Sequence, residues 1–321
     1  MSKRNKHTAQ AISFLLFSCV LAFEGAISVR TLFFAPEKVV VEPVMEKLVT
    51  QDPFDAVSVV AESAVVMDIT TGEFLFSKDP KTIRPIASIT KVMSALVSSE
   101  QLSDNSEVQI AQSALAQDED NGLLLNEKWS FRKLLDFSLL VSSNDGAYAI
   151  ANVVGSLDRN RLNKDVIADA TSSVNIFVQK MNQKAQIIGL NDTNFNNPSG
   201  LDVDTVVSGG YSTATDVAKM FAYVVKNNRH IVEATTLQND EFVSEDGISH
   251  LAQNTNSAYP NIPSLLASKT GYTDLAGGNL AIVYDVGVNH PIAIVVLDST
   301  FRERFTDIEA LVSATDKYFS R

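Results

Sequence analysis

Residues 85–96 read PIASITKVMSAL, and this stretch is the most informative part of the sequence. A proline precedes apolar residues at helical spacing, which predicts a buried helix over Ser88–Ser99. Ser88 would stand at the helix N-terminus, whose partial positive charge favours a developing anion. Lys91 follows three residues later on the same helical face, within reach of the serine.

Ser88 and Lys91 together could form an activated nucleophile, with the serine as the attacking group and the lysine as its base. A serine hydroxyl needs a neighbouring base to take its proton. A lysine can serve as that base when burial and nearby cations lower its pKa. S-x-x-K is a weak signal alone, and the chain has a second match, Ser130-Phe131-Arg132-Lys133. The residues around that match indicate a helix N-cap, so we expect Ser88 to be the nucleophile.

A serine and an asparagine two residues apart could together relay a proton and hold a substrate backbone. This Ser-x-Asn pattern occurs at Ser103-Asp104-Asn105, Ser142-Ser143-Asn144 and Ser173-Val174-Asn175. The first lies in a polar stretch that predicts an exposed loop, and the third begins a predicted helix as a cap. The second lies between two apolar helical stretches, which would hold its loop in place. We therefore favour Ser142 and Asn144.

Lys269-Thr270-Gly271 ends a predicted strand, Ser264–Lys269. A cation beside a hydroxyl can bind a free carboxylate, and glycine lets another backbone approach the strand edge. No other catalytic motif competes with this one. The four histidines are scattered, and H-E-x-x-H, G-x-S-x-G and the P-loop pattern are all absent from the sequence. We therefore expect no metal and no organic cofactor.

Taken together, these three motifs resemble the penicillin-recognising serine enzymes. Within that group the chain is similar to the D-alanyl-D-alanine carboxypeptidases, the low-molecular-mass penicillin-binding proteins. The similarity extends from Ser63 to Phe319 and includes AVVMDITTGEFLF (64–76), PIASITKVMSAL (85–96), LLVSSNDGAYAIA (139–151), FNNPSGL (195–201) and KTGYTDLAGGNL (269–280). The sequence departs from the family pattern at Ser143, where glycine is usual, and at Gly146, where alanine is usual.

The resemblance implies a serine acyl-enzyme mechanism. Lys91 takes the proton from Ser88, which attacks the carbonyl between two D-alanines. Ser142 relays a proton to the leaving amine, and water releases the acyl group.

The resemblance also implies a set of substrate-binding residues. Asn144 would hold the peptide, and Lys269 with Thr270 would bind the terminal carboxylate. Gly271, the glycine of the same motif, would let the substrate backbone approach the edge of this strand. The backbone N–H groups of Ser88 and Tyr272 would form the oxyanion hole.

The order of the elements predicts an α+β fold. Strands are expected at 64–69, 73–77, 264–269, 280–286 and 291–297, and helices at 88–99, 130–141, 147–154, 173–188, 213–225 and 303–319. Strands at both ends with helices between them indicate a sheet built from the chain ends. The resemblance specifies the β-lactamase/transpeptidase-like fold, an antiparallel sheet flanked by helices with a helical subdomain.

The N-terminus predicts export. Lys3, Arg4 and Lys6 precede the uncharged stretch Ala11–Phe23, which is typical of an export signal. We divide the chain into a signal peptide or membrane anchor over 1–35, a linker over 36–55 and a catalytic domain over 56–321. The catalytic domain would lie on the extracytoplasmic side, either anchored or secreted.

The formal charge of −12 argues against a nucleic-acid partner, since phosphate binding needs a concentrated basic surface. The resemblance implies that the substrates are peptidoglycan stem peptides ending in D-Ala-D-Ala, with β-lactam antibiotics as inhibitors. The alternatives are a β-lactamase or transpeptidase of the same fold, or a non-catalytic peptidoglycan-binding protein.

Overall fold

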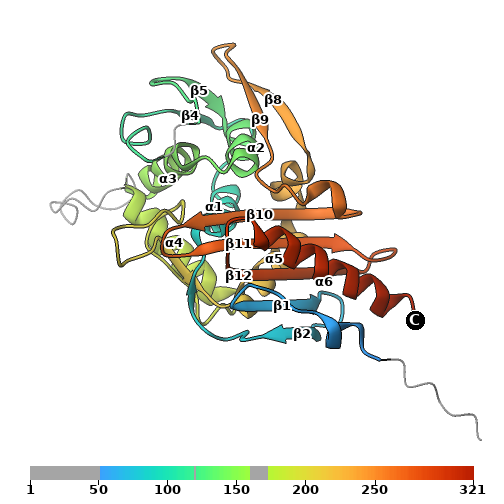
Figure 1. Ribbon diagram of the computed structural model, residues 1–321. Helices are drawn as coiled ribbons and strands as arrows, with labels where there is room; N and C mark the ends of the chain where they lie inside the picture. Colours follow the sequence, from blue (N-terminus) through green and yellow to red (C-terminus); the bar gives the residue numbers. More distant parts are fainter. Residues whose placement is uncertain (1–50, 119–120, 160–172) are drawn as a thin grey trace, which may run out of the picture. The chain divides into compact units, whose positions relative to one another are not determined.

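A five-stranded antiparallel sheet forms the centre of the computed structural model, which describes residues 51–118, 121–159 and 173–321 (Figure 1). The strand order is β10-β11-β12-β1-β2. The bounds of these strands are β1 Ser63–Asp68, β2 Phe74–Lys78, β10 Leu265–Thr273, β11 Gly277–Asp285 and β12 Pro291–Ser299. Because β1 pairs with β12, the sheet joins both ends of the domain, and the predicted α+β class is confirmed. The predicted signal or anchor lies outside the described residues, as do residues 36–50 of the predicted linker.

Alternate residues of β1 pack into two different apolar clusters. Val65 and Met67 belong to the cluster that includes helix α5 (Ala214–Asn228). Ala64 and Val66 belong to the cluster that includes helix α6 (Glu303–Phe319). Side chains alternate between the faces of a strand, so each face of the sheet has its own helix cover. This explains why β1 is buried along its whole length and why its central residues, 64–67, are all apolar.

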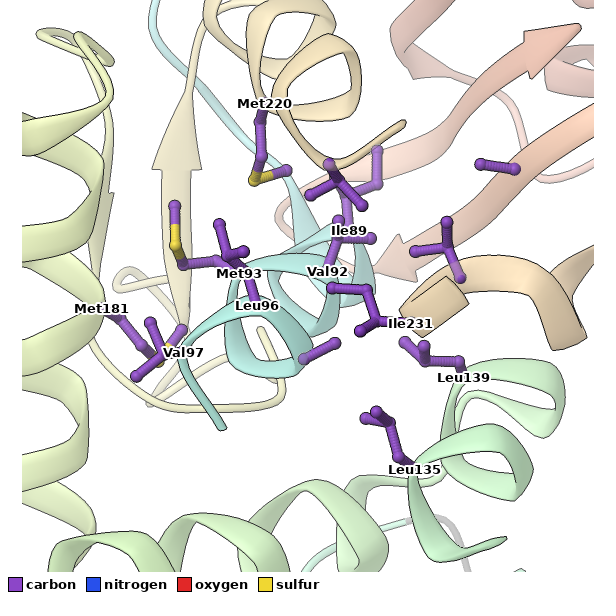
Figure 2. Packing of buried hydrophobic residues seen from close by; sticks show 14 of the residues in the cluster. Ile89, Val92, Met93, Leu96, Val97, Leu135, Leu139, Met181, Met220 and Ile231 are labelled. Carbon is purple, nitrogen blue, oxygen red and sulfur yellow. The ribbon is translucent and has the colours of Figure 1, made fainter. Parts of the chain in front are cut away.

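The remaining helices surround α1, which is buried at nine of its ten positions. Figure 2 shows α1 side chains between those of neighbouring helices, with Leu135, Met181 and Met220 among the contacts. The bounds of these helices are α1 Thr90–Ser99, α2 Phe131–Val141, α3 Asn144–Arg159 and α4 Ser173–Ile187. The predicted helix over Ser88–Ser99 divides into a 3₁₀ turn, η2 (Ala87–Ile89), followed by α1.

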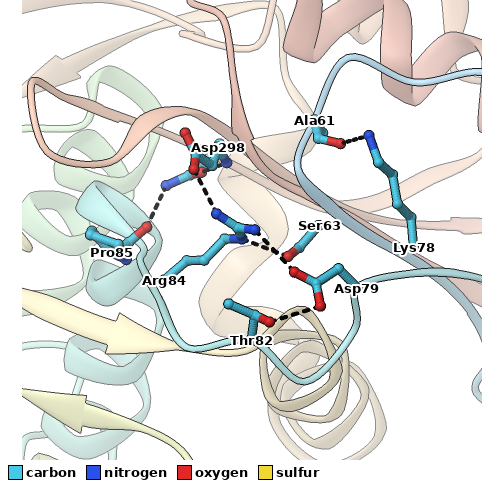
Figure 3. A network of polar contacts seen from close by, with 9 residues as sticks. Ala61, Ser63, Lys78, Asp79, Thr82, Arg84, Pro85 and Asp298 are labelled. Carbon is cyan, nitrogen blue, oxygen red and sulfur yellow. Dashed lines mark hydrogen bonds and ion pairs between the residues drawn. The ribbon is translucent and has the colours of Figure 1, made fainter.

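The segment before η2 is attached to the sheet by Arg84 (Figure 3). Its guanidinium donates to Ser63 Oγ at 2.7 Å, to Asp298 at 2.7 Å and to Asp79 at 3.0 Å. Asn279 Nδ2 donates to the carbonyl of the next residue, Pro85, at 3.1 Å. Strands β1, β11 and β12 thereby fix the start of the turn that carries Ser88.

Ser130 occupies the N-cap position of α2, but its hydroxyl makes no capping hydrogen bond. The helix amides Phe131 N and Arg132 N instead donate to the carbonyls of Ser106 (2.8 Å) and Asp104 (3.0 Å). Ser130 therefore stands at the predicted cap position, but the prediction that its hydroxyl caps the helix is wrong. Carbonyl groups of a neighbouring loop already accept hydrogen bonds from those amides.

Three small sheets were not predicted, because their strands are short. They are β3 (Arg84–Pro85) with β7 (Gly210–Ser212) and β6 (Asn194–Phe195), then β4 (Glu107–Gln109) with β5 (Lys128–Ser130), and β8 (Asn239–Val243) with β9 (Ser249–Gln253).

Gly146 lies where helices α2 and α3 approach each other closely. A Cβ atom at this position would be 1.9 Å from Ser138 Oγ and 3.1 Å from Ser138 Cβ. The space that alanine would fill is therefore occupied by the hydroxyl of a buried serine.

We expect Gly146→Ala to lower the free energy of unfolding by about 1–2 kcal/mol, since overpacking outweighs the higher helix propensity of alanine. Urea unfolding would measure the change. The double variant Ser138→Ala/Gly146→Ala should lose less, because the closest atom is removed. An unchanged unfolding midpoint for Gly146→Ala would contradict this account.

Candidate active site

Ser88 lies in the 3₁₀ turn η2, directly after a residue in an unusual conformation. Ala87 is buried and has a φ of 46°, a region that L side chains rarely adopt. Lys91 Nζ lies 2.7 Å from Ser88 Oγ, so the structure brings together the predicted nucleophile and base.

The Lys91 side chain is buried and contacts three separate segments. Its Nζ donates to Ser88 Oγ (2.7 Å), to Asn144 Oδ1 (2.7 Å) and to the carbonyl of Ser199 (3.0 Å). A buried amine is costly unless it is hydrogen-bonded, and these acceptors compensate the burial of the Lys91 amine. The Ser199 carbonyl was not predicted, since a backbone acceptor leaves no signal in side-chain identity.

Ser142 is the C-terminal cap of α2 and has a left-handed backbone, with φ 66° and ψ 34°. Ser143 is buried, and its Oγ accepts a hydrogen bond from Gly146 N at 3.1 Å. Ser142 Oγ accepts a hydrogen bond from Lys269 Nζ at 2.9 Å. Asn144 begins α3 and reaches Lys91. This loop thus brings Ser142 and Asn144 beside the two lysines of the site.

The two competing Ser-x-Asn segments lie elsewhere. Ser103 is exposed, and its hydroxyl lies 3.1 Å from Ser106 Oγ. Ser173 begins α4, and its hydroxyl lies 2.9 Å from Ser156 Oγ.

Strand β10 carries Lys269, Thr270 and Gly271 along the edge of the central sheet. A Cβ atom at Gly271 would lie 2.7 Å from the Ile86 carbonyl oxygen and 3.2 Å from Ser88 N. Glycine therefore allows the strand to pack directly against the nucleophile turn. As an edge strand, β10 also keeps unpaired backbone groups that an extended peptide could join.

Arg304, in the first turn of α6, is a site residue that the sequence did not reveal. Its guanidinium donates to the Gly271 carbonyl at 2.7 Å and lies 4.7 Å from the ring centre of Phe301. The side chain is 4% exposed, and burial lowers the pKa of Arg304 to about 10, so it stays charged at neutral pH. Its Nε has no hydrogen-bond partner, and no carboxylate among the described residues forms an ion pair with it.

These groups surround a cleft of about 340 Å³. Its lining residues are Ser88, Val141, Ser142, Thr255, Thr270, Gly271, Tyr272, Phe301 and Arg304. Two larger hollows, of about 620 and 670 Å³, lie elsewhere, and neither Ser88 nor any residue of the three sequence motifs lines them. The smaller cleft is therefore the candidate active site. Within the described ranges, no group of three or more His, Cys, Asp or Glu side chains is arranged to hold a metal ion.

A family model described as D-alanyl-D-alanine carboxypeptidase, peptidase family S11, matches residues 47–164 and 165–300. The chain belongs to this family. It is therefore a serine DD-peptidase of peptidoglycan metabolism and a penicillin-binding protein homologue, as its motifs led us to expect.

Individual relatives differ in their stated activities. The D-alanyl-D-alanine carboxypeptidase DacB2 of Mycobacterium tuberculosis is 33% identical over 218 residues, which cover 67% of each chain. The D-alanyl-D-alanine endopeptidase of Escherichia coli is 29% identical over 242 residues, covering 74% of this chain and 71% of the relative. A structure of the Streptomyces K15 DD-transpeptidase aligns with a TM-score of 0.68 at 25% identity, covering 83% of this chain and 100% of that one. These matches establish the penicillin-binding protein fold and a DD-peptidase, while the relatives' stated activities include both carboxypeptidase and endopeptidase.

We expect Ser142→Ala to slow acylation by penicillin about 10²-fold or more, the usual scale for a group that transfers a proton. The matched control is Ser103→Ala, which removes an exposed hydroxyl and should acylate at the wild-type rate. Stopped-flow labelling with a fluorescent penicillin measures both rates. Equal rates for wild type and Ser142→Ala would refute the role of this loop.

Proposed function

We propose that this DD-peptidase is a serine-type carboxypeptidase, which removes the terminal D-alanine from peptidoglycan stem peptides through a Ser88 acyl-enzyme. The observation that supports this most directly is the pairing of two features in one cleft. Lys91 Nζ and Ser88 Oγ lie 2.7 Å apart, and the buried guanidinium of Arg304 has no carboxylate partner in the part of the chain that the structure describes.

Arg304 supports a substrate that ends in a free carboxylate. Taking a cation out of water is costly unless an anion or several acceptors compensate it. The Gly271 carbonyl provides one acceptor, and Thr270 with its hydroxyl lines the cleft alongside Arg304. A carboxylate bound between Thr270 and Arg304 would supply the missing charge, and such a group next to the scissile bond marks a C-terminal residue.

The acylation step can be derived from the Lys91 contacts. With Lys91 neutral, the 2.7 Å contact reverses its direction, and Ser88 Oγ–H donates to Nζ. The oxygen then bonds to the carbonyl carbon of the penultimate D-alanine as its proton moves to Lys91. The backbone N–H groups of Ser88 and Tyr272 would stabilise the oxyanion, and a lost donor of this kind typically costs ~3 kcal/mol.

The leaving group departs with a proton relayed through Ser142. Lys269 Nζ donates to Ser142 Oγ, which orients the hydroxyl beside the cleft. The C–N bond breaks, the nitrogen takes the relayed proton, and free D-alanine leaves. Water then attacks the acyl-enzyme and regenerates the Ser88 hydroxyl.

The stretch FNNPSGL (195–201) supports a peptidase over a β-lactamase. Class A β-lactamases use a loop glutamate to activate the deacylating water, and this stretch contains no glutamate. Its residues have other functions here, because Asn197 Oδ1 accepts from Gly200 N at 2.7 Å and the Ser199 carbonyl contacts Lys91. A penicilloyl adduct should therefore be long-lived.

We expect the full chain in detergent to release one D-alanine from each diacyl-D-Ala-D-Ala peptide without added metal. Ser88→Ala should abolish release and penicillin labelling, because it removes the attacking oxygen. Ser130→Ala, at the second S-x-x-K, is the matched control and should change neither activity nor stability. Chromatography of the products and decay of the penicillin label measure the outcome.

Different results would identify the alternatives. Preferential cleavage of cross-linked dimers would identify an endopeptidase, and dominant cross-linking with an added amine would identify a transpeptidase. Rapid penicillin turnover without D-alanine release would identify a β-lactamase. Binding of stem peptides without labelling or turnover would indicate a non-catalytic protein.

We also propose that the catalytic domain lies outside the cytoplasmic membrane. The support is the basic and then apolar start of the sequence. Within residues 51–118, 121–159 and 173–321, no helix has the length and apolar character needed to cross a bilayer.

Protease added to intact spheroplasts of the producing cell should digest the domain, while a cytoplasmic marker protein stays intact. Complete protection of the domain under these conditions would refute export.

A further inference from the structure

Thr255 lies opposite Thr270 in the cleft, in the loop that follows β9. The two side-chain oxygens, Thr255 Oγ1 and Thr270 Oγ1, are 2.6 Å apart. Both residues line the cleft that contains Ser88. Thr255 belongs to none of the three sequence motifs, so its position is a finding of the structure.

The loop around Thr255 is held on both sides. Thr255 N donates to the carbonyl of Leu140 at 3.3 Å, near the end of the helix that Ser142 caps. The preceding residue, Asn254, donates from Nδ2 to the Leu237 carbonyl at 2.7 Å, and its Oδ1 accepts from Asn256 N at 2.8 Å. The Thr255 hydroxyl is therefore presented from a fixed backbone.

Two hydroxyl groups at this distance form one hydrogen bond, in which either oxygen can be the donor. The direction of that hydrogen bond decides whether the Thr270 proton is available to a bound carboxylate. Each hydroxyl has one proton to donate and two lone pairs. If Thr270 donates to Thr255, it can present only lone pairs to a bound carboxylate. If Thr255 donates to Thr270, the Thr270 proton is available for the carboxylate. Hydrogen bonds in such a chain strengthen one another.

We propose that Thr255 is a positioning residue, whose hydroxyl donates to Thr270 and thereby directs the Thr270 proton toward the carboxylate of the bound molecule. This inference rests on the proposed function, in which Thr270 and Arg304 bind that carboxylate. Thr255 acts through Thr270 and touches no reacting atom.

The test compares Thr255→Val, which keeps the shape of the side chain and removes the hydroxyl, with Thr255→Ser, which keeps the hydroxyl. The full-length chain is acylated with benzylpenicillin, which has a free carboxylate, and with its methyl ester, which has none. Thr255→Val should lower the second-order acylation rate constant for the acid about fivefold, the scale of one hydrogen bond. It should leave the rate constant for the ester unchanged, and Thr255→Ser should restore the rate for the acid.

A double-mutant cycle separates positioning from a general structural effect. In a Thr270→Val background there is no hydroxyl to orient, so adding Thr255→Val should cause no further loss for the acid. With the D-Ala-D-Ala peptide, Thr255→Val should raise KM about fivefold and leave kcat nearly unchanged.

Three results would overturn the proposal: equal losses for acid and ester, no restoration by Thr255→Ser, or additive losses in the double variant. The acylation comparison does not depend on D-alanine release. If wild type is labelled but releases no D-alanine, the proposed function fails while the role of Thr255 is still tested.

Discussion

The arrangement of the site depends on the hydrogen bonds that the buried amine of Lys91 donates. Its acceptors include groups from the turn that carries Ser88, the start of α3 and the carbonyl of Ser199. An amine in a low-dielectric interior is tolerated only when its hydrogen bonds are made, so each segment is constrained by the other two. These hydrogen bonds tie the nucleophile to the helical region on one side and to the 195–201 loop on the other.

The central sheet supplies the second constraint, since β10 must lie directly against the nucleophile turn. Gly271 permits this approach because any side chain there would meet the Ile86 carbonyl and the Ser88 amide. Arg84 holds the same turn from the opposite direction through Ser63 and Asp298. Ser88 is thus fixed between an edge strand and a helix, and Ala87 takes up the resulting strain at a φ of 46°.

The sequence predicted most of the regular elements, because their apolar periods are strong. The helix predicted over Glu303–Phe319 matches α6, and the strand pairs at both ends of the domain join one sheet. Short strands such as β8 and β9 were missed, because only Phe242, His250 and Ala252 are buried among their ten residues.

Within the site, the residues predicted were those whose chemistry is visible in a local motif. Ser88 and Lys91 are close in sequence, so helical spacing alone brings them together. Arg304 and Thr255 could not be found in this way, since each reaches the cleft only through tertiary packing. For the same reason, the sequence suggested a capping hydroxyl at Ser130 where distant carbonyls cap the helix instead.

Two features of the cleft would each be compensated by a bound peptide. The outer edge of β10 lacks a strand neighbour in the sheet, and the buried Arg304 forms no ion pair with a carboxylate of the described residues. An extended peptide ending in a carboxylate would satisfy both, so binding compensates costs already present in the folded protein. The strain at Ala87 is different, because a ligand does not relieve it. The backbone at Ala87 sets the direction of the Ser88 amide that follows it. In the proposed mechanism this amide donates to the oxyanion, and a donor that already points in a fixed direction would not have to reorganise during the reaction.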